Sequence, residues 1–171
     1  MERTLIILKP DTLKRGIAGE IISRFERVGL KIVGTKMVHP DESHYFHHYE
    51  NIGKMVSRRG QKAFDVTLAM MNEGPVIAFV LEGVEAVSLV RKMVGTTEPK
   101  SALPGTIRGD YAHMSFGHAD QEGIGIPNLV HASGDPAEAI EEIGHWFTKD
   151  ELFEYETVHQ RYTQAVNRKK K

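Results

Sequence analysis

A histidine lies where a short apolar stretch gives way to the start of a helix. His131 falls within residues 128–132, and Asp135, Pro136 and Glu138 suit the N-cap, first-turn and third positions of a following helix. Unpaired backbone N–H groups at a helix N-terminus favour anions such as phosphate, and a neutral imidazole offers a nitrogen lone pair. The pattern therefore predicts a nucleophile that attacks phosphate, although a histidine at a strand end is more often structural.

Further residues could bind the charges of a phosphate group. Lys9 ends an apolar run, and Arg108 lies in the glycine-containing segment 104–110. Each has an ordinary explanation when taken alone, because strand-end lysines are usually solvated and Gly-Asp pairs usually form turns. Arg91 borders an apolar helical stripe, where an exposed ion pair is the ordinary interpretation.

Hydrophobic periodicity predicts the elements that must position these side chains. Apolar, β-branched runs predict strands at 4–8, 31–38, 76–82 and 129–132. Helical spacing predicts helices at 18–28, 63–71, 84–94 and 136–147, with a polar helical stretch that begins near residue 40. Segments 51–61 and 96–127 lack periodicity and are expected to be loops. This order fits an α+β fold, a ferredoxin-like β-α-β-β-α-β antiparallel sheet with additional helices and one long loop.

Length and composition limit the classes of function. The 171 residues, 40% of them hydrophobic, predict one domain over 1–171 whose residues 166–171 form a frayed basic tail. The 22 basic and 23 acidic side chains give a net charge of −1, which argues against nucleic acid as a partner. The chain has no cysteine, so thiolate metal sites and disulfides are excluded. Its apolar runs are shorter than the ~20 residues of a membrane helix and its start shows no signal pattern, so we expect a cytoplasmic protein that does not bind membranes.

Three motifs taken together resemble one known family. Lys9-Pro10-Asp11, segment 104–110 and segment 128–133 occur in the order and topology of the nucleoside diphosphate kinases, over about residues 3–152. The resemblance implies transfer of the γ-phosphate from a nucleoside triphosphate to a nucleoside diphosphate, by a ping-pong mechanism through a phosphohistidine, which maintains nucleotide pools. The implied substrates include ATP, GTP, ADP and GDP. Mg²⁺ would be carried by the nucleotide phosphates, and the chain would form a homo-oligomer of two, four or six copies.

The resemblance also implies roles for individual residues. His131 matches the phosphate acceptor, through its pros nitrogen, and Glu142 matches the residue that orients it. Lys9 and Tyr49 complete the implied catalytic set, and Ser133 matches a hydroxyl beside the site, although a serine before a helix needs no catalytic explanation. The implied nucleotide-binding residues are Lys9, Phe64, Arg91, Thr97, Arg108 and Asn128.

The chain departs from the family pattern in three places. The usual base-stacking aromatic aligns with Ala63, so Phe64 is the neighbour that could substitute for it. An apparent insertion at 112–126 extends the long loop at the nucleotide site and carries His113 and His118. Asp135 falls one position late, which leaves open whether it contacts magnesium through water or only caps the helix.

Other interpretations remain open at this stage. His44, His47 and His48 could share a helical face at metal-ligand spacing, but no carboxylate or further histidine supports that site. A binding module with the same fold would bind ATP without forming a phosphohistidine. A nucleic-acid-binding domain that uses the sheet and the basic tail is a third alternative, and the near-zero net charge argues against it.

Overall fold

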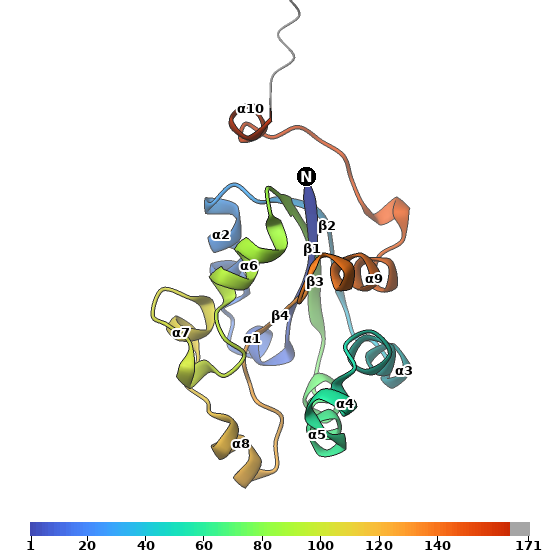
Figure 1. The fold of residues 1–171 in the computed structure, drawn as a ribbon, viewed down its shortest axis with the longest axis vertical. Coiled ribbons are helices and arrows are strands. Elements are labelled where there is room, and N and C mark those ends of the chain that lie inside the picture. The colour runs from blue at the N-terminus through green and yellow to red at the C-terminus, as the bar shows by residue number, and fades with distance from the viewer. Residues whose placement is uncertain (165–171) are drawn as a thin grey trace, which may run out of the picture.

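An antiparallel four-stranded sheet in the order β2-β3-β1-β4 forms the centre of the computed structural model, which describes residues 1–164 (Figure 1). The strands are β1 (Glu2–Leu8), β2 (Lys31–Val38), β3 (Val76–Gly83) and β4 (Val130–Ala132). Helices separate β1 from β2 and β3 from β4, as the β-α-β-β-α-β pattern requires. The predicted α+β, ferredoxin-like fold is confirmed.

The central strand β1 divides the core into two parts. Ile6 and Leu8 face one cluster of buried side chains, whereas Leu5 and Ile7 face the other, because successive strand residues point to opposite faces. The first cluster is covered by α2 (Ala18–Arg27) and α6 (Ala86–Val94), and the second by α3 (Glu42–Phe46), α5 (Gln61–Met71) and α9 (Pro136–Trp146). Burial on both faces explains why β1 is apolar without alternation.

Helix ends follow the local signals in the sequence. The Asp135 side chain accepts hydrogen bonds from the backbone N–H groups of Ala137 and Glu138, both at 2.9 Å, and so caps α9. Gly29 and Gly95 follow α2 and α6 with φ of +86° each, a conformation that glycine adopts without steric penalty. The short helix α1 (Pro10–Lys14) begins directly after β1, and its proline occupies the first turn.

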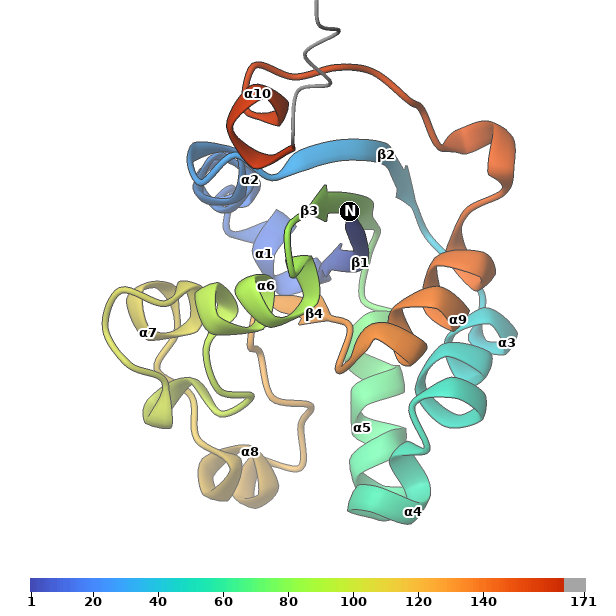
Figure 2. The same ribbon diagram turned by 45° about the horizontal axis from the view of Figure 1, so that its top comes forward.

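The segments predicted as loops contain additional helices. The prediction for 51–61 is wrong, because a π-helical turn η1 (His47–Ile52) leads into α4 (Met55–Arg59), whose residues include no fully buried side chain. Because α4 has no buried face, its sequence shows no helical repeat of apolar residues. The long segment 96–127 holds η2 (Pro99–Ser101), α7 (Ile107–Tyr111) and α8 (Phe116–Glu122). In Figure 2, α8 lies across from α4 and α5.

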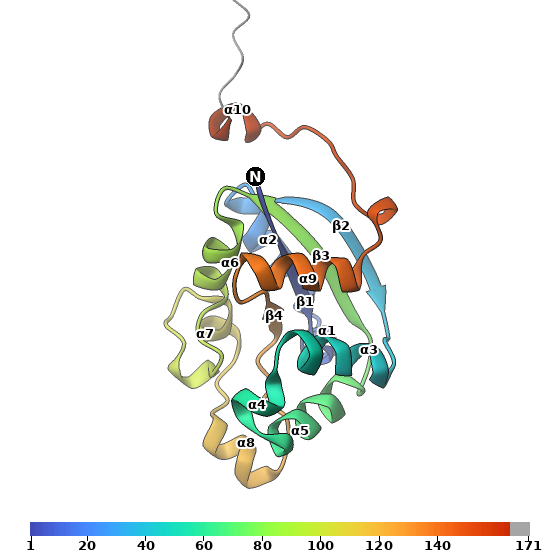
Figure 3. The same cartoon turned by 45° about the vertical axis from the view of Figure 1, so that its right-hand side comes forward.

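After α9 the chain continues through η3 (Lys149–Glu151), runs past β2 and reaches α10 (Gln160–Thr163) (Figure 3). The Phe153 N–H donates to the Val33 carbonyl at 2.7 Å, and the Tyr155 hydroxyl donates to the Ile32 carbonyl at 2.6 Å. These contacts cover part of the β2 edge. The basic tail predicted at 166–171 lies outside the described residues, and within residues 1–164 no helix has the length and apolar character to cross a bilayer.

Candidate active site

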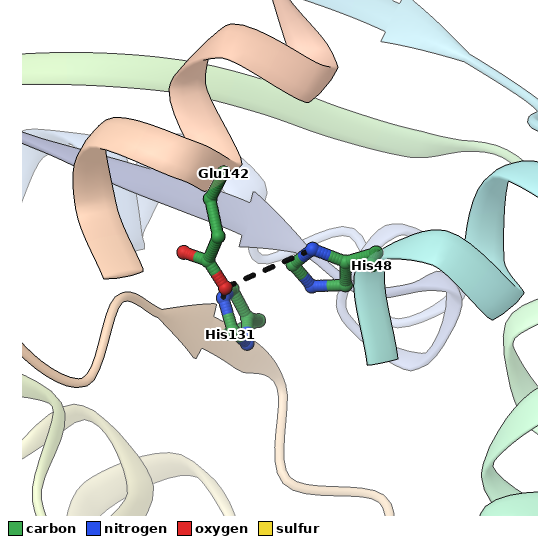
Figure 4. Close-up of side chains that lie close together, drawn as sticks. All are labelled: His48, His131 and Glu142. Atoms are coloured by element: carbon green, nitrogen blue, oxygen red, sulfur yellow. Dashed lines mark ion pairs between the residues drawn. The ribbon is translucent and has the colours of Figure 1, made fainter. Parts of the chain in front are cut away.

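His131 projects from β4 toward a carboxylate on the next helix. Its Nε2 atom is buried and lies 2.7 Å from Oε1 of Glu142, which points down from α9 (Figure 4). The two atoms are close, but their directions do not make a well-aligned hydrogen bond. The His131 side chain keeps 17% of its surface exposed, and it lines a cleft of about 750 Å³.

The Glu142 carboxylate is itself held in place from the sheet. Its other oxygen, Oε2, accepts a hydrogen bond of 2.7 Å from the Ser133 hydroxyl, and Ser133 Oγ accepts one of 3.1 Å from the Leu5 N–H. Ser133 and Glu142 are both fully or almost fully buried. The serine thus links β1 to the carboxylate beside His131. The sequence did not predict this link, because a serine before a helix is common.

His48 is a neighbour of His131. The sequence indicated only that it could belong to a metal cluster. It is buried on η1, and its ring centroid lies 4.5 Å from that of His131 (Figure 4). Its Nδ1 accepts a hydrogen bond of 3.2 Å from the Trp146 indole and lies 3.7 Å from Glu142 Oε1. Burial, with His131 close by, lowers the pKa of His48 well below its ordinary value, so this imidazole is neutral.

The alternative of a metal site formed by His44, His47 and His48 is not supported by the structure. His48 points into the core, His47 is exposed, and His44 stacks on His145 with 3.8 Å between ring centroids. The three side chains therefore do not converge on one ion. In the described part of the chain, the ligand atoms that do lie within 4.8 Å of one another belong to His48, His131 and Glu142, the surroundings of the candidate nucleophile itself.

Lys9 and Asn128 form a buried polar pair beside His131. The Lys9 ammonium donates to Asn128 Oδ1 at 2.8 Å, and the Asn128 amide donates to the Thr97 carbonyl at 2.9 Å. Burial lowers the pKa of Lys9 to about 8. The lysine is therefore a charged donor at neutral pH whose charge is lost in mildly alkaline solution.

Arg108 is fixed by backbone carbonyls on three sides. Its guanidinium donates to Asn128 at 3.1 Å, to Gly95 at 2.9 Å and to Val130 at 2.5 Å. Burial, with Arg91 close by, lowers its pKa to about 10, which leaves the group positively charged at neutral pH. Together with Arg91 and Lys9, it contributes positive charge to the cleft that His131 also lines.

Leu129, between these residues, has an unusual backbone conformation. Its φ is +73°, in the left-handed region that residues with a side chain rarely adopt, and its side chain is completely buried. The Leu129 N–H donates to Asp11 at 3.0 Å, and its carbonyl accepts from the Lys9 N–H at 2.9 Å and the Thr12 hydroxyl at 2.6 Å. These bonds stabilise the strained turn that leads into β4.

All but one of the predicted catalytic and nucleotide-binding residues line the cleft. The predicted residues that line it are Lys9, Tyr49, Arg91, Thr97, Arg108, Asn128, His131 and Glu142. Phe64 is the exception, because it is 5% exposed and packs edge-on against Phe46 with 5.7 Å between ring centroids. The cleft-facing residues of α5 are Ala63, Val66 and Thr67, since one step along a helix turns a side chain by ~100°. The structure thus corrects the stacking role expected of Phe64.

Comparison with known proteins identifies the family to which the chain belongs. The family model "Nucleoside diphosphate kinase" matches residues 2–152. The curated nucleoside diphosphate kinase of Borreliella burgdorferi is 44% identical over 159 residues, which cover 91% of this chain and 92% of that protein. That of Pyrococcus furiosus is 45% identical over 155 residues, covering 91% and 88%.

A solved structure extends this likeness to the fold. The transition-state mimic of the nucleoside-diphosphate kinase from Borrelia burgdorferi, with bound vanadate and ADP, superimposes with a TM-score of 0.91 at 42% identity. The alignment covers 95% of this chain and 96% of that one. The chain belongs to the nucleoside diphosphate kinase family, and it is therefore a phosphotransferase that acts on nucleotides.

Proposed function

We propose that His131 carries the phosphate between the two nucleotides. The observation that supports this role is the contact of its buried Nε2 with Glu142 at 2.7 Å, which leaves Nδ1, the pros nitrogen, for the substrate. In the first half-reaction the Nδ1 lone pair forms a bond to the γ-phosphorus, the bond to the bridging oxygen breaks, and the nucleoside diphosphate leaves. In the second, a terminal oxygen of another nucleoside diphosphate forms a bond to that phosphorus and the N–P bond breaks.

The positive charge in the cleft suits a reaction that depends on positioning and charge. Lys9, Arg91 and Arg108 would contact the phosphate oxygens, with the Thr97 hydroxyl as a further donor. Arg108 is already oriented by its three carbonyl partners, so it needs no rearrangement to meet a developing negative charge. Asn128, held by Lys9 and Thr97, would bind the sugar hydroxyl.

Glu142 and Tyr49 complete the proposed catalytic set. A carboxylate beside Nε2 favours the tautomer that carries its proton there, which keeps the Nδ1 lone pair free. Burial raises the pKa of Tyr49 far above its ordinary value, so the phenol stays neutral. Its ring lies 6.4 Å from that of His131, where a neutral hydroxyl would serve as a hydrogen-bond donor.

The donor set of the cleft fits a magnesium ion that arrives with the nucleotide. Mg²⁺ prefers oxygen ligands and retains several waters, and it usually needs few protein carboxylates when phosphates are present. Glu142 is already bound to Ser133, and Asp135 is already bound to two backbone N–H groups. We therefore assign no protein residue as a direct ligand. When bound, the ion would neutralise charge on the nucleotide phosphates.

We also propose that the chain is one domain that assembles as a cytoplasmic homo-oligomer. Val84 and Ile140 are 52% and 75% exposed beside an apolar groove that Ile143 and Phe147 also line, which supports a contact with another copy. The lack of cysteine is compatible with a reducing compartment. Sedimentation equilibrium would measure the number of copies, and a monomer at micromolar concentration would contradict the assembly.

Labelling with γ-³²P-ATP tests the proposed role of His131. We expect the wild-type protein to acquire acid-labile phosphate and to release it to added GDP. His131→Gln should acquire none, whereas the control His118→Gln, an exposed histidine of the insertion, should label like the wild type. A His131→Gln variant that is labelled and turns over normally would overturn the proposal. ATP binding without any labelling of the wild type would favour a non-catalytic binding module.

A further inference from the structure

The α5 wall of the cleft offers no aromatic ring to a nucleotide base. Ala63 faces the cleft but has no ring, and Phe64 faces Phe46 instead. Among the described residues, the aromatic side chains that line the cleft are His48, Tyr49, His131 and Phe116. The first three surround the phosphate-transfer site, as the short distances between their rings show. Phe116 comes from a separate wall, helix α8 of the 112–126 insertion.

Local contacts hold Phe116 at this wall. Its backbone N–H donates to Glu98 Oε1 at 2.9 Å, and the Ser115 hydroxyl caps α8 by accepting from the His118 N–H at 3.2 Å. Where the insertion returns to the core, a Cβ atom on Gly125 would lie 2.6 Å from the Val66 carbonyl oxygen. That close approach places the end of the insertion directly against α5, and α8 lines the cleft beside it.

One face of the Phe116 ring is in contact with a cation. The guanidinium of Arg59, on α4, lies over the ring with its Cζ atom 4.2 Å from the centroid, and both residues line the cleft. Within residues 1–164, Arg59 takes part in no side-chain hydrogen bond or salt bridge, so the exposed arginine can move away from the ring without losing another partner. The contact shows that this face of the ring is not covered by the core, because a side chain from another helix reaches it.

We propose that Phe116 is the platform on which the nucleotide base stacks in this chain, and that the base displaces Arg59 from it. The proposal rests on the proposed function of the cleft and names the residue that holds the base. Every base has a π-face, so stacking on a ring tolerates different bases. The insertion thereby supplies the base contact that α5 does not provide.

Calorimetric titration with ADP and with pyrophosphate tests this platform, because pyrophosphate has the phosphates but no base. We expect Phe116→Ala to weaken ADP binding about tenfold while the affinity for pyrophosphate stays within a factor of two. Phe116→Tyr, which keeps the ring, should bind ADP within a factor of two of the wild type. His118→Ala on the same helix is the matched control and should bind both ligands normally.

The outcomes separate this proposal from its alternatives. Wild-type ADP affinity in Phe116→Ala would mean that the base is held elsewhere. Equal losses for ADP and pyrophosphate would mean that the ring only maintains the shape of the cleft, and either result overturns the proposal. The proposed role of His131 is tested separately by labelling. If that role is wrong, the comparison of ADP with pyrophosphate binding still tests the role of Phe116.

Discussion

The carboxylate of Glu142 lies 2.7 Å from Nε2 of His131, and we expect its charge to favour the imidazole tautomer that carries the proton on that nitrogen. In Glu142→Gln the side chain keeps its size, but the amide can donate to Nε2 and so favour the proton on Nδ1, where it would block attack on phosphorus. We expect the single-turnover rate of His131 phosphorylation to fall at least tenfold, by analogy with loss of an orienting or charge-stabilising group.

Ser133→Ala is a milder change at the same contact and can be compared with Glu142→Gln. It removes the 2.7 Å hydrogen bond to Glu142 but leaves the carboxylate charge, so the rate should fall less than in Glu142→Gln. Rapid-quench measurement of phosphohistidine would give both rates. Phosphorylation of Glu142→Gln at the wild-type rate would show that the contact is only structural.

The buried Lys9 predicts an alkaline limit to activity. Because burial lowers its pKa to about 8, the free protein loses this cation as the pH rises through that value. We expect kcat/KM for ATP, which reports the free enzyme, to fall as the pH rises above about 8. In Lys9→Arg the guanidinium stays charged, so the alkaline fall should move to higher pH. An identical alkaline limit in both proteins would assign it to another group.

At the scale of elements, the first turn of α9 depends on Asp135. Its side chain accepts two backbone N–H groups, so Asp135→Ala should lower the free energy of unfolding by about 1 kcal/mol, whereas Asp135→Asn should retain most of the cap. Urea denaturation measures this difference. If Asp135→Asn also needs more Mg²⁺ than the wild type to reach half its maximal rate, the carboxylate contacts the ion as well.

The elements differed in how far the sequence could predict them. The helix that follows Asp135 and the strand that carries His131 were predicted because caps and buried apolar periods are local signals. Helix α4 was missed because none of its side chains is fully buried, and Phe64 was assigned to the cleft because sequence alone does not fix which side of α5 faces it. The burial of Arg108 depends on carbonyls from three distant positions, which no local pattern encodes.

For the whole molecule, a buried charge cluster joins three strands of the sheet. Glu82 lies 2.6 Å from the Lys31 ammonium and 2.8 Å from the Arg3 guanidinium, and Lys31 and Glu82 are both buried. Burial alone would raise the pKa of Glu82, but hydrogen bonds and charge from Lys31 and Arg3 bring it below the ordinary value of 4.5. This cluster therefore stabilises the fold above that value, and its contribution is lost as the pH falls through the lowered pKa.

Replacing Glu82 tests this contribution. Glu82→Gln leaves the buried Lys31 without a counter-charge, so we expect a loss of about 3 kcal/mol in unfolding free energy at neutral pH. The difference from the wild type should shrink in acid, where Glu82 is protonated in both the folded and unfolded states. The exposed Glu26→Gln is the control in the same urea titrations and should show no such pH dependence. A constant difference at all pH values would point to packing rather than charge.

The left-handed turn at Leu129 has a consequence for the reaction cycle. Its strain, of the order of 1–3 kcal/mol, is balanced by bonds within the chain and not by a ligand. We therefore expect the donor and the acceptor of the phosphate to bind, one after the other, beside the same preorganised turn. On the proposed mechanism, one nucleotide would replace the other while the backbone that positions His131 keeps its conformation.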